Sequence, residues 1–237
     1  MSLPCNLAAL SNEFLVAVKR GDETETYQSK LADITESGLA ALNENEQAAT
    51  AFWINLYNAF VQHHLERDPS LYENKRRFFG EPPIVVAGTE LSLDDLEHGL
   101  LRSSKWKYGL GYLPRPFPST FERSYRLPEV DPRIHFALNC GAESCPSIAA
   151  YTANDIDSEL DTSTRSFLGQ SSTDDWDADQ IWVTRLFLYY RGDFGGRHGI
   201  YEFLERYNVI DGGDHPRVRY KQYDWTRHTG MYRDDSP

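Results

Sequence analysis

One short stretch of the sequence combines an imidazole with two of the chain's three thiols. Residues 131–146 contain His135, Cys140 and Cys145, whereas the third cysteine, Cys5, lies near the N-terminus. A thiolate can attack a carbonyl carbon, and a nearby imidazole can lower the pKa of the thiol and carry its proton. The stretch therefore has the residue types of a cysteine nucleophile with a histidine base.

The local pattern predicts a strand followed by a loop. Residues 134–138 form an apolar run of strand length, and glycine, serine and proline then interrupt regular structure where the thiols lie. Because side chains alternate along a strand, His135 and Cys140 face opposite sides unless the loop turns back. Pro146 suits the first turn of a helix, whose N-terminal dipole would favour a thiolate at Cys145. The pattern leaves open which thiol is the nucleophile, and whether the two form a disulfide.

A thiol site also needs groups that orient the imidazole, hold the substrate and stabilise an oxyanion. Backbone N–H groups around Gly141 could serve as oxyanion donors. The candidates for catalysis are Cys140, Cys145, His135, Asn58, Glu97 and Asp224, with Asn55 as a further orienting group. The candidates for binding are Asn55, Tyr57, His98, Arg102, Asn139 and Ser144.

Other interpretations of the same residues remain open. In a non-catalytic interaction or scaffolding module the cysteines would be structural, because a buried cysteine behaves as a small apolar residue. A metal site would use His135, both thiols and either His98 or His63. The Cys-x4-Cys pair lacks the spacing and the second pair of familiar zinc sites, so no metal ligand and no cofactor is predicted. Thiol redox chemistry lacks its usual Cys-x2-Cys motif.

A buried helix over residues 48–65 is expected to support this segment, because it is apolar almost all round. Asn55, Asn58 and Gln62 recur at i, i+3 and i+7 and so share one face. Buried amides need partners, since an unmatched polar group costs about 1–3 kcal/mol. They either bind the backbone of a neighbouring loop or orient groups in a site.

A second helix is expected after a β-hairpin over residues 84–91. A serine caps this helix, with an aspartate at the capping-box position three residues later. The helix carries Glu97 and His98 side by side and Arg102 in its last turn. Such charges serve helix ends and the surface, or else face an active cleft.

The rest of the chain predicts an α+β fold, with N-terminal helices and a central buried helix packed on a small, mainly antiparallel sheet. We expect a single domain over residues 1–237, with 1–45 as helical cover and 229–237 as a frayed tail. A segment rich in proline and aromatic residues, 103–132, could wall a cleft. Two amphipathic helices are expected within 6–47, and further helices at 154–168, 186–190 and 200–207, with strands at 181–183 and 218–225.

Composition narrows the function classes. The formal charge is 24 − 36 = −12, which argues against nucleic acid as the main partner, because phosphate binding needs a basic surface. Membrane insertion is not expected, since no apolar run reaches the length of a transmembrane helix. The N-terminus lacks the pattern of a signal peptide, so a cytoplasmic location is expected, although a processed secreted chain would look the same. Nothing in the sequence predicts an oligomeric state.

Four motifs, in order, resemble the DUF547 family of domains of unknown function. They are FWINLYNA at 52–59, LDDLEHGLLR at 93–102, HFALNCGAESCP at 135–146 and YDW at 223–225. The resemblance covers roughly residues 45–226, and the residues after Trp225 depart from the family's closing motif. It implies a link to papain-like thiol hydrolases. That link predicts a hydrolase or acyl transferase acting on amide or ester bonds of a small-molecule or peptide substrate.

Overall fold

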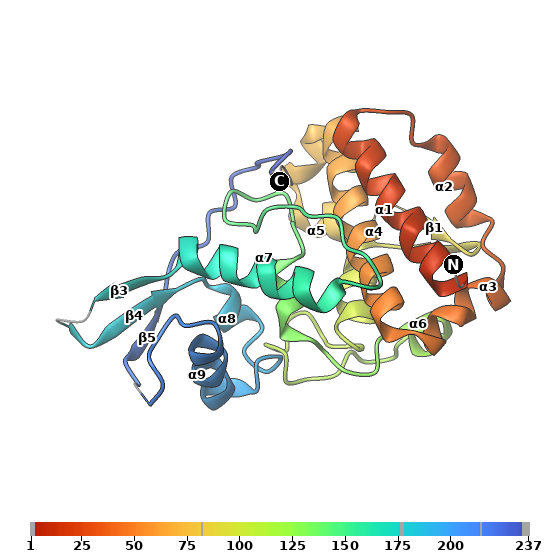
Figure 1. The fold of residues 1–237 in the computed structure, drawn as a ribbon. Helices are drawn as coiled ribbons and strands as arrows, with labels where there is room; N and C mark the ends of the chain where they lie inside the picture. The colour runs from red at the N-terminus through yellow and green to blue at the C-terminus, as the bar shows by residue number, and fades with distance from the viewer. Residues whose placement is uncertain (1–2, 82, 176–177, 214, 234–237) are drawn as a thin grey trace.

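The structure of the protein is a computed structural model that describes residues 3–81, 83–175, 178–213 and 215–233. Helices predominate and the strands form small sheets, so the predicted α+β class is confirmed. The N-terminal helices gather at one end of the molecule, and the three-stranded sheet extends at the other (Figure 1).

The N-terminal helices lie around a long central helix. One of the two helices predicted within 6–47 is confirmed. The second is interrupted, because Thr35 caps a new helix by accepting a hydrogen bond from the N–H of Gly38. The elements are α1 (Leu3–Arg20), α2 (Glu25–Ala32), α3 (Glu36–Ala40), a 3₁₀ turn (Ala41–Glu44) and α4 (Glu46–Arg67).

Helix α4 is the predicted central helix, and all but a few of its side chains are buried. The side-chain amides of α4 form hydrogen bonds with the backbone of distant segments. Asn55 accepts a hydrogen bond from the N–H of Tyr151 (2.9 Å) and donates one to its carbonyl (2.8 Å). Asn58 donates to the carbonyl of Ala137 and accepts from the N–H of Asn139, both at 2.9 Å. The backbone-binding alternative is therefore the correct one for these two residues.

Gln62 and Asn139 extend this bracing to the thiol loop and the end of the chain. Gln62 accepts from the N–H of Gly230 (2.8 Å) and donates to Asn139 Oδ1 (3.4 Å). Asn139 also accepts from the N–H of Gly141 (2.9 Å) and donates to the carbonyl of Pro146 (2.7 Å). Residues 229–233 are thus tied to the core, so the expected fraying is wrong for them; 234–237 lie outside the described residues.

The predicted hairpin and capped helix are both present. Strands β1 (Ile84–Val86) and β2 (Thr89–Leu91) pair in antiparallel register. Ser92 and Asp95 form the capping box, with Ser92 Oγ accepting from the N–H of Asp95 (3.1 Å) and Asp95 accepting from that of Ser92 (3.0 Å). The helix itself, Asp95–Leu101, has π-type hydrogen bonding. It is preceded along the chain by a 3₁₀ turn (Pro69–Glu73) and α5 (Lys75–Gly80).

The strand predicted at 134–138 is wrong, because residues Pro132–Phe136 form a 3₁₀ helix. Asp131 begins it, since its side chain accepts from the N–H of Arg133 (2.9 Å) and Pro132 supplies a helical φ. His135 therefore lies on a tight helical turn that follows an irregular segment. Within that segment, α6 (Thr120–Tyr125) is regular.

The C-terminal part forms a second hydrophobic cluster with the three-stranded sheet. The order is β3-β4-β5, with β3 antiparallel and β5 parallel to β4. The strand predicted at 218–225 is shorter than expected. Helix α4 belongs to the other, larger cluster and not to this one. The elements are α7 (Ile156–Ser171), β3 (Thr173–Asp175), β4 (Gln180–Val183), α8 (Leu186–Tyr189), α9 (Gly196–Arg206) and β5 (Arg217–Tyr220).

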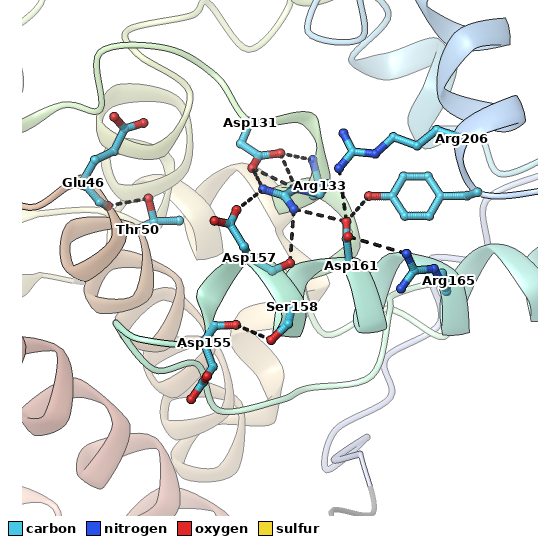
Figure 2. A network of polar contacts seen from close by, with 11 residues as sticks. Glu46, Thr50, Asp131, Arg133, Asp155, Asp157, Ser158, Asp161, Arg165 and Arg206 are labelled. Atoms are coloured by element: carbon cyan, nitrogen blue, oxygen red, sulfur yellow. Dashed lines mark hydrogen bonds and ion pairs between the residues drawn. The ribbon is translucent and has the colours of Figure 1, made fainter.

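A charge network fixes the His135 turn onto α7 (Figure 2). The guanidinium of Arg133 contacts the carboxylates of Asp131 (2.6 Å), Asp157 (2.7 Å) and Asp161 (3.1 Å). Asp131 directly precedes the turn in the sequence, whereas Asp157 and Asp161 project from α7. Charge-assisted hydrogen bonds between a guanidinium and carboxylates are strong and directional, so they fix the relative positions of the segments that they join. The turn is therefore held by α7 through Arg133, and by α4 through the hydrogen bond from Asn58 to the carbonyl of Ala137.

The bracing by Asn58 predicts a large stability loss in Asn58→Ala. That change leaves the Ala137 carbonyl and the Asn139 N–H buried without partners, so the free energy of unfolding should fall by roughly 2–4 kcal/mol. Urea denaturation measures it. Asn43→Ala is the matched control, because Asn43 is exposed in a 3₁₀ turn, and it should stay within about 0.5 kcal/mol of wild type. Equal stability of the two variants would contradict the bracing role.

Candidate functional site

A cavity of about 840 Å³ lies beside the thiol loop. The helix Asp95–Leu101, the His135 turn and α5 all contribute to its wall. Its lining combines polar and reactive side chains with apolar ones. The polar and reactive members include Tyr57, Glu97, His98, His135, Cys140 and Tyr190; the apolar members include Phe79, Leu110, Leu138, Leu186, Tyr189 and Trp225.

His135 is held by a carboxylate on its Nε2 side. Nε2 lies 2.9 Å from Asp193 Oδ2, and that oxygen also accepts from Arg102 Nε at 2.6 Å. The imidazole stacks on the ring of Tyr190, with centroids 3.9 Å apart and an interplanar angle of 11°. Asp193 thus orients an imidazole whose position is further fixed by aromatic stacking. In nucleophile–histidine–acid sites, an imidazole oriented by a carboxylate acts as the base.

Burial and the interactions between neighbouring groups act in opposite directions on the pKa values of this pair. Burial lowers the pKa of His135, although Asp193 acts in the opposite direction. Burial would also raise the pKa of Asp193, but the hydrogen bonds and charges of His135 and Arg102 lower it to about 2. At neutral pH the site therefore holds an aspartate and a neutral imidazole that can accept a proton.

Glu97 and His98 are buried, so the expectation that they serve helix ends and the surface is wrong. Glu97 accepts from the hydroxyl groups of Tyr57 (3.1 Å) and Tyr190 (2.7 Å). Burial would raise the pKa of Glu97, but the charge of Arg102 and the hydrogen bond from Tyr190 act in the opposite direction, and the pKa is lowered. The carboxylate is therefore ionised in the wall of the cavity.

Arg102 links the two carboxylates and sets the tautomer of His98. Its side chain is fully buried, and Nη1 lies 2.8 Å from His98 Nδ1. A guanidinium only donates, so this nitrogen of His98 must be the unprotonated acceptor. Burial lowers the pKa of His98, consistent with a neutral ring. The protonated Nε2 then faces Asp94 Oδ1 at 3.6 Å, and Asp94 also forms an ion pair with Lys107.

The two thiols contact each other. Their sulfur atoms are 2.6 Å apart, and the hydroxyl of Tyr223 lies 3.2 Å from Cys145 Sγ and 3.5 Å from Cys140 Sγ. The N–H of Cys140 donates to Cys145 Sγ at 3.1 Å. Gly141 allows the loop to turn between them, because its φ of +80° suits glycine. The structure thus brings together thiols that the sequence separates by five positions.

Their surroundings give the thiols different properties. Burial acts to raise the pKa of Cys145, but donors from Cys140 and Tyr223 outweigh it and lower this pKa. The hydrogen bond to Cys145, together with burial, raises the pKa of Cys140. The pair therefore holds its first negative charge on Cys145. Cys140 is half-buried and lines the large cavity, whereas Cys145 is buried and lines a second cavity of about 360 Å³.

The structure brings only part of the predicted site together. Glu97, His135 and Cys140 line one cavity, with Tyr57 and His98, and Arg102 lies behind them. Other predicted residues lie elsewhere. Asn55, Asn58 and Asn139 are fully buried, their amides bind backbone groups, and none of the three lines the cavity.

Asp224 and Ser144 also lie outside the wall of the large cavity. Asp224 is exposed, and its carboxylate accepts from the N–H of Thr226 (2.8 Å) instead of orienting His135. Ser144 Oγ accepts from the N–H of Asp224 (2.8 Å) and lines the smaller cavity. Both residues hold a loop in place.

The sequence alone does not indicate that Asp193 binds His135, or that the hydroxyl of Tyr190 binds Glu97. A signal was present in the glycines around Asp193. A Cβ on Gly192 would lie 2.4 Å from the backbone of Gly111, and one on Gly111 would lie 2.5 Å from the N of Asp193. Glycines beside a lone acid mark a close backbone approach, which often accompanies a site.

A metal site finds no support in the described ranges. Within residues 3–81, 83–175, 178–213 and 215–233, no three His, Cys, Asp or Glu side chains gather in a way that could hold a metal ion. His63 instead lies 3.5 Å from Thr24 Oγ1 and 3.3 Å from Gln28 Nε2. In the same ranges no helix is long and apolar enough to cross a membrane.

Fold and site together define an α+β protein in which a thiol and an acid-oriented imidazole face one cavity. The chain belongs to the DUF547 family, described as "Protein of unknown function, DUF547", which matches residues 39–168, more than half of the chain. The predicted family is confirmed, and the match contains the first three motifs but ends before the fourth. No curated protein and no solved structure matched the chain, so the papain-like relationship stays a prediction.

The thiol contact predicts that excess oxidised glutathione joins Cys140 to Cys145. Each thiol loses its hydrogen, a sulfur–sulfur bond forms, and oxidised glutathione is reduced to two thiols. The tryptic peptide 134–165 contains both cysteines, so its mass should fall by about 2 Da relative to the reduced peptide. Cys140→Ser should instead leave a single thiol that takes up one glutathione. A stable glutathione adduct on the wild-type peptide, with no internal bridge, would contradict the prediction.

The low pKa of Asp193 predicts a specific acid sensitivity. A carboxylate whose folded pKa is depressed stabilises the fold above its unfolded pKa, and this stability is lost as pH falls toward the folded value of about 2. The wild-type free energy of unfolding should therefore lose roughly 2 kcal/mol through this group between about pH 4 and pH 2.

Asp193→Asn should start less stable, because Arg102 and His135 lose a charged partner, and should show a shallower dependence on pH in that window. Asp174→Asn is the control, since Asp174 is exposed in β3. Urea denaturation at a series of pH values measures both. An unchanged slope in Asp193→Asn would show that this carboxylate is not the depressed group.

Proposed function

We propose that the protein is a cysteine-dependent hydrolase or acyl transferase acting on an amide or ester bond. Cys140 would be the nucleophile, His135 the base and Asp193 the residue that orients the base. The observation that carries this proposal is that Cys140 and an imidazole fixed by a buried aspartate line the same cavity. Family membership is compatible with the proposal but does not identify a reaction.

The reaction follows from these groups. The thiol proton of Cys140 passes to neutral His135 while the sulfur attacks the acyl carbon and the carbonyl electrons move to oxygen. The tetrahedral adduct collapses, the bond to the leaving group breaks, and that group takes the proton from the imidazolium. Water or another acceptor then attacks the thioester, releases the acyl group and returns the proton to Cys140 by way of His135.

The contact with Cys145 does not supply the base. Donors from Cys140 and Tyr223 favour the thiolate of Cys145, which makes that sulfur a weak proton acceptor, so His135 would take the proton of Cys140. Of the two thiols, Cys140 faces the large cavity that His135 also lines. Cys140 would therefore form the bond to substrate, while Cys145 helps to hold it in place by accepting a hydrogen bond from its N–H.

A non-catalytic interaction module is the second candidate. In the part of the chain that the structure describes, no hydrogen bond joins His135 to either thiol, and Cys145 is buried. Cysteines with a purely structural role would show the same resting geometry. Catalytic hydrogen bonds often tighten only when substrate is bound, so the two candidates differ in reactivity more than in resting geometry.

Thiol reactivity distinguishes the candidates. A chloroacetamide probe at neutral pH should label Cys140 in the peptide 134–165, and Cys140→Ser should abolish that label. His135→Ala should slow labelling about 100-fold, and Asp193→Asn should slow it less, because the imidazole remains. His198→Ala is the matched control, since His198 is an exposed histidine on α9, and it should label like wild type.

Labelling that is insensitive to His135→Ala would remove the histidine from the mechanism. No labelling of the folded wild-type protein, checked by recovery of the label after denaturation, would favour the interaction module.

A further inference from the structure

The geometry points to a ligand in which an apolar acyl group is joined to an anionic group, with Lys75 and Arg76 as the partners of the anion. This inference concerns the cavity of the proposed reaction and names its substrate class, so it rests on the proposed function. It comes from the charges and the apolar surface around the cavity.

Most charges in the cavity wall already have partners. Asp94 is paired with Lys107, and both oxygens of Glu97 accept tyrosine hydroxyls. Lys75 and Arg76 differ: among the described residues, neither forms an ion pair with a carboxylate. The two cations are adjacent in the sequence, and both line the cavity. Their position on the wall of a cavity suits a ligand anion.

Lys75 is connected to the thiol loop through the ring of Tyr72. Its Nζ donates to the carbonyl of Tyr72 (2.8 Å) and is 3.3 Å from the centroid of that tyrosine's ring. The same ring borders the thiol loop, because a Cβ on Gly141 would lie 3.4 Å from Tyr72 Cε2. Gly141 follows Cys140 directly. The anion of the ligand is therefore expected close to the acyl carbon that Cys140 attacks.

The rest of the cavity wall suits an apolar group. Its side chains include Leu138, Leu186 and Tyr189, and the lining continues into exposed apolar residues at the rim. Leu110 is 45% exposed and Trp225 is 42% exposed. Apolar surface that is continuous from a cavity to its rim commonly marks a ligand-binding site.

The position of Leu110 at the rim is enforced by the backbone. Its φ is 52°, an unfavourable value for a leucine, and its carbonyl accepts from the N–H of Gly192 at 2.7 Å. Strained backbone conformations cluster at functional sites, so the strain at this exposed leucine supports a role in ligand binding. A cavity of about 840 Å³ has the size of a site for a small amphiphilic molecule and is too small for a folded protein.

The test is direct binding to Cys140→Ser, which removes the chemistry and keeps the cavity. Isothermal titration compares octanoate with octanamide, octylammonium and acetate. Octanoate should bind at least about tenfold more tightly than each of the other three, because it alone has both the chain and the negative charge. Lys75→Gln with Arg76→Gln should weaken octanoate binding about tenfold and leave octanamide unchanged.

Two further variants separate the contributions. Arg77→Gln is the matched control, because Arg77 lies on the same helix but pairs with Glu81 at 2.9 Å outside the cavity wall; octanoate affinity should change by less than about twofold. Leu110→Asn keeps a residue type that tolerates positive φ and removes the apolar group. It should weaken octanoate and octanamide alike, by about threefold or more.

Equal affinity for octanoate and octanamide, or octanoate binding that is unaffected by the double substitution, would overturn the inference. The inference would also be overturned if octanoate did not bind to Cys140→Ser protein whose thermal unfolding transition shows that it is folded. Each of these results can occur while Cys140 of the wild-type protein still reacts with the chloroacetamide probe in a His135-dependent way. The substrate class can thus fail while the proposed function stands.

Discussion

The requirement that buried amides find partners organises this structure. Three amide side chains on one face of α4 lie out of reach of water, and each is satisfied by the backbone of a distant segment. Such segments have no regular neighbours of their own, so they depend on the helix for their hydrogen bonds. The turn that carries His135, the loop that carries the thiols and the end of the described chain are all held in this way.

A second constraint is the burial of charge. Arg102 is fully buried, and such a cation is tolerated only with close partners. Asp193 and the neutral nitrogen of His98 supply them, while Glu97 takes hydroxyl groups from two tyrosines. This set of contacts fixes the tautomer of one histidine and the orientation of another. The catalytic proposal depends on it, because an imidazole acts as a base only when it is held in the required orientation.

Much of this arrangement is readable in the sequence. The buried helix, the hairpin and the capping box follow from periodicity and turn residues, which act over a few positions. The turn at 132–136 is different, because its apolar residues suit a strand, and only the cap at Asp131 and the contacts of Arg133 select a helical turn. Local patterns are outweighed there by charges that come from α7.

The motifs indicate the segment that carries the candidate site, but local patterns do not identify all the residues that line the cavity. Glu97 and His98 are polar residues at positions that also suit a surface helix, and burial alone distinguishes the two. Asp193 is 58 residues from His135, so no spacing rule joins them. Asn58 was assigned to catalysis on its residue type, whereas its geometry makes it a brace. Residue type can suggest chemistry, but long-range contacts decide which residues take part.

The close backbone contact between Gly111 and Gly192 has a practical consequence for protein engineering. Segment 103–118 runs over the surface and carries exposed aromatic residues, features that usually invite truncation when a chain is trimmed for crystallisation or immobilisation. Here the segment is the outer support of the loop that ends in Asp193. Deleting this segment would remove the backbone contacts that support the loop of Asp193. Tags, cross-links and shortened loops are therefore better placed elsewhere, for example near the exposed strand β3.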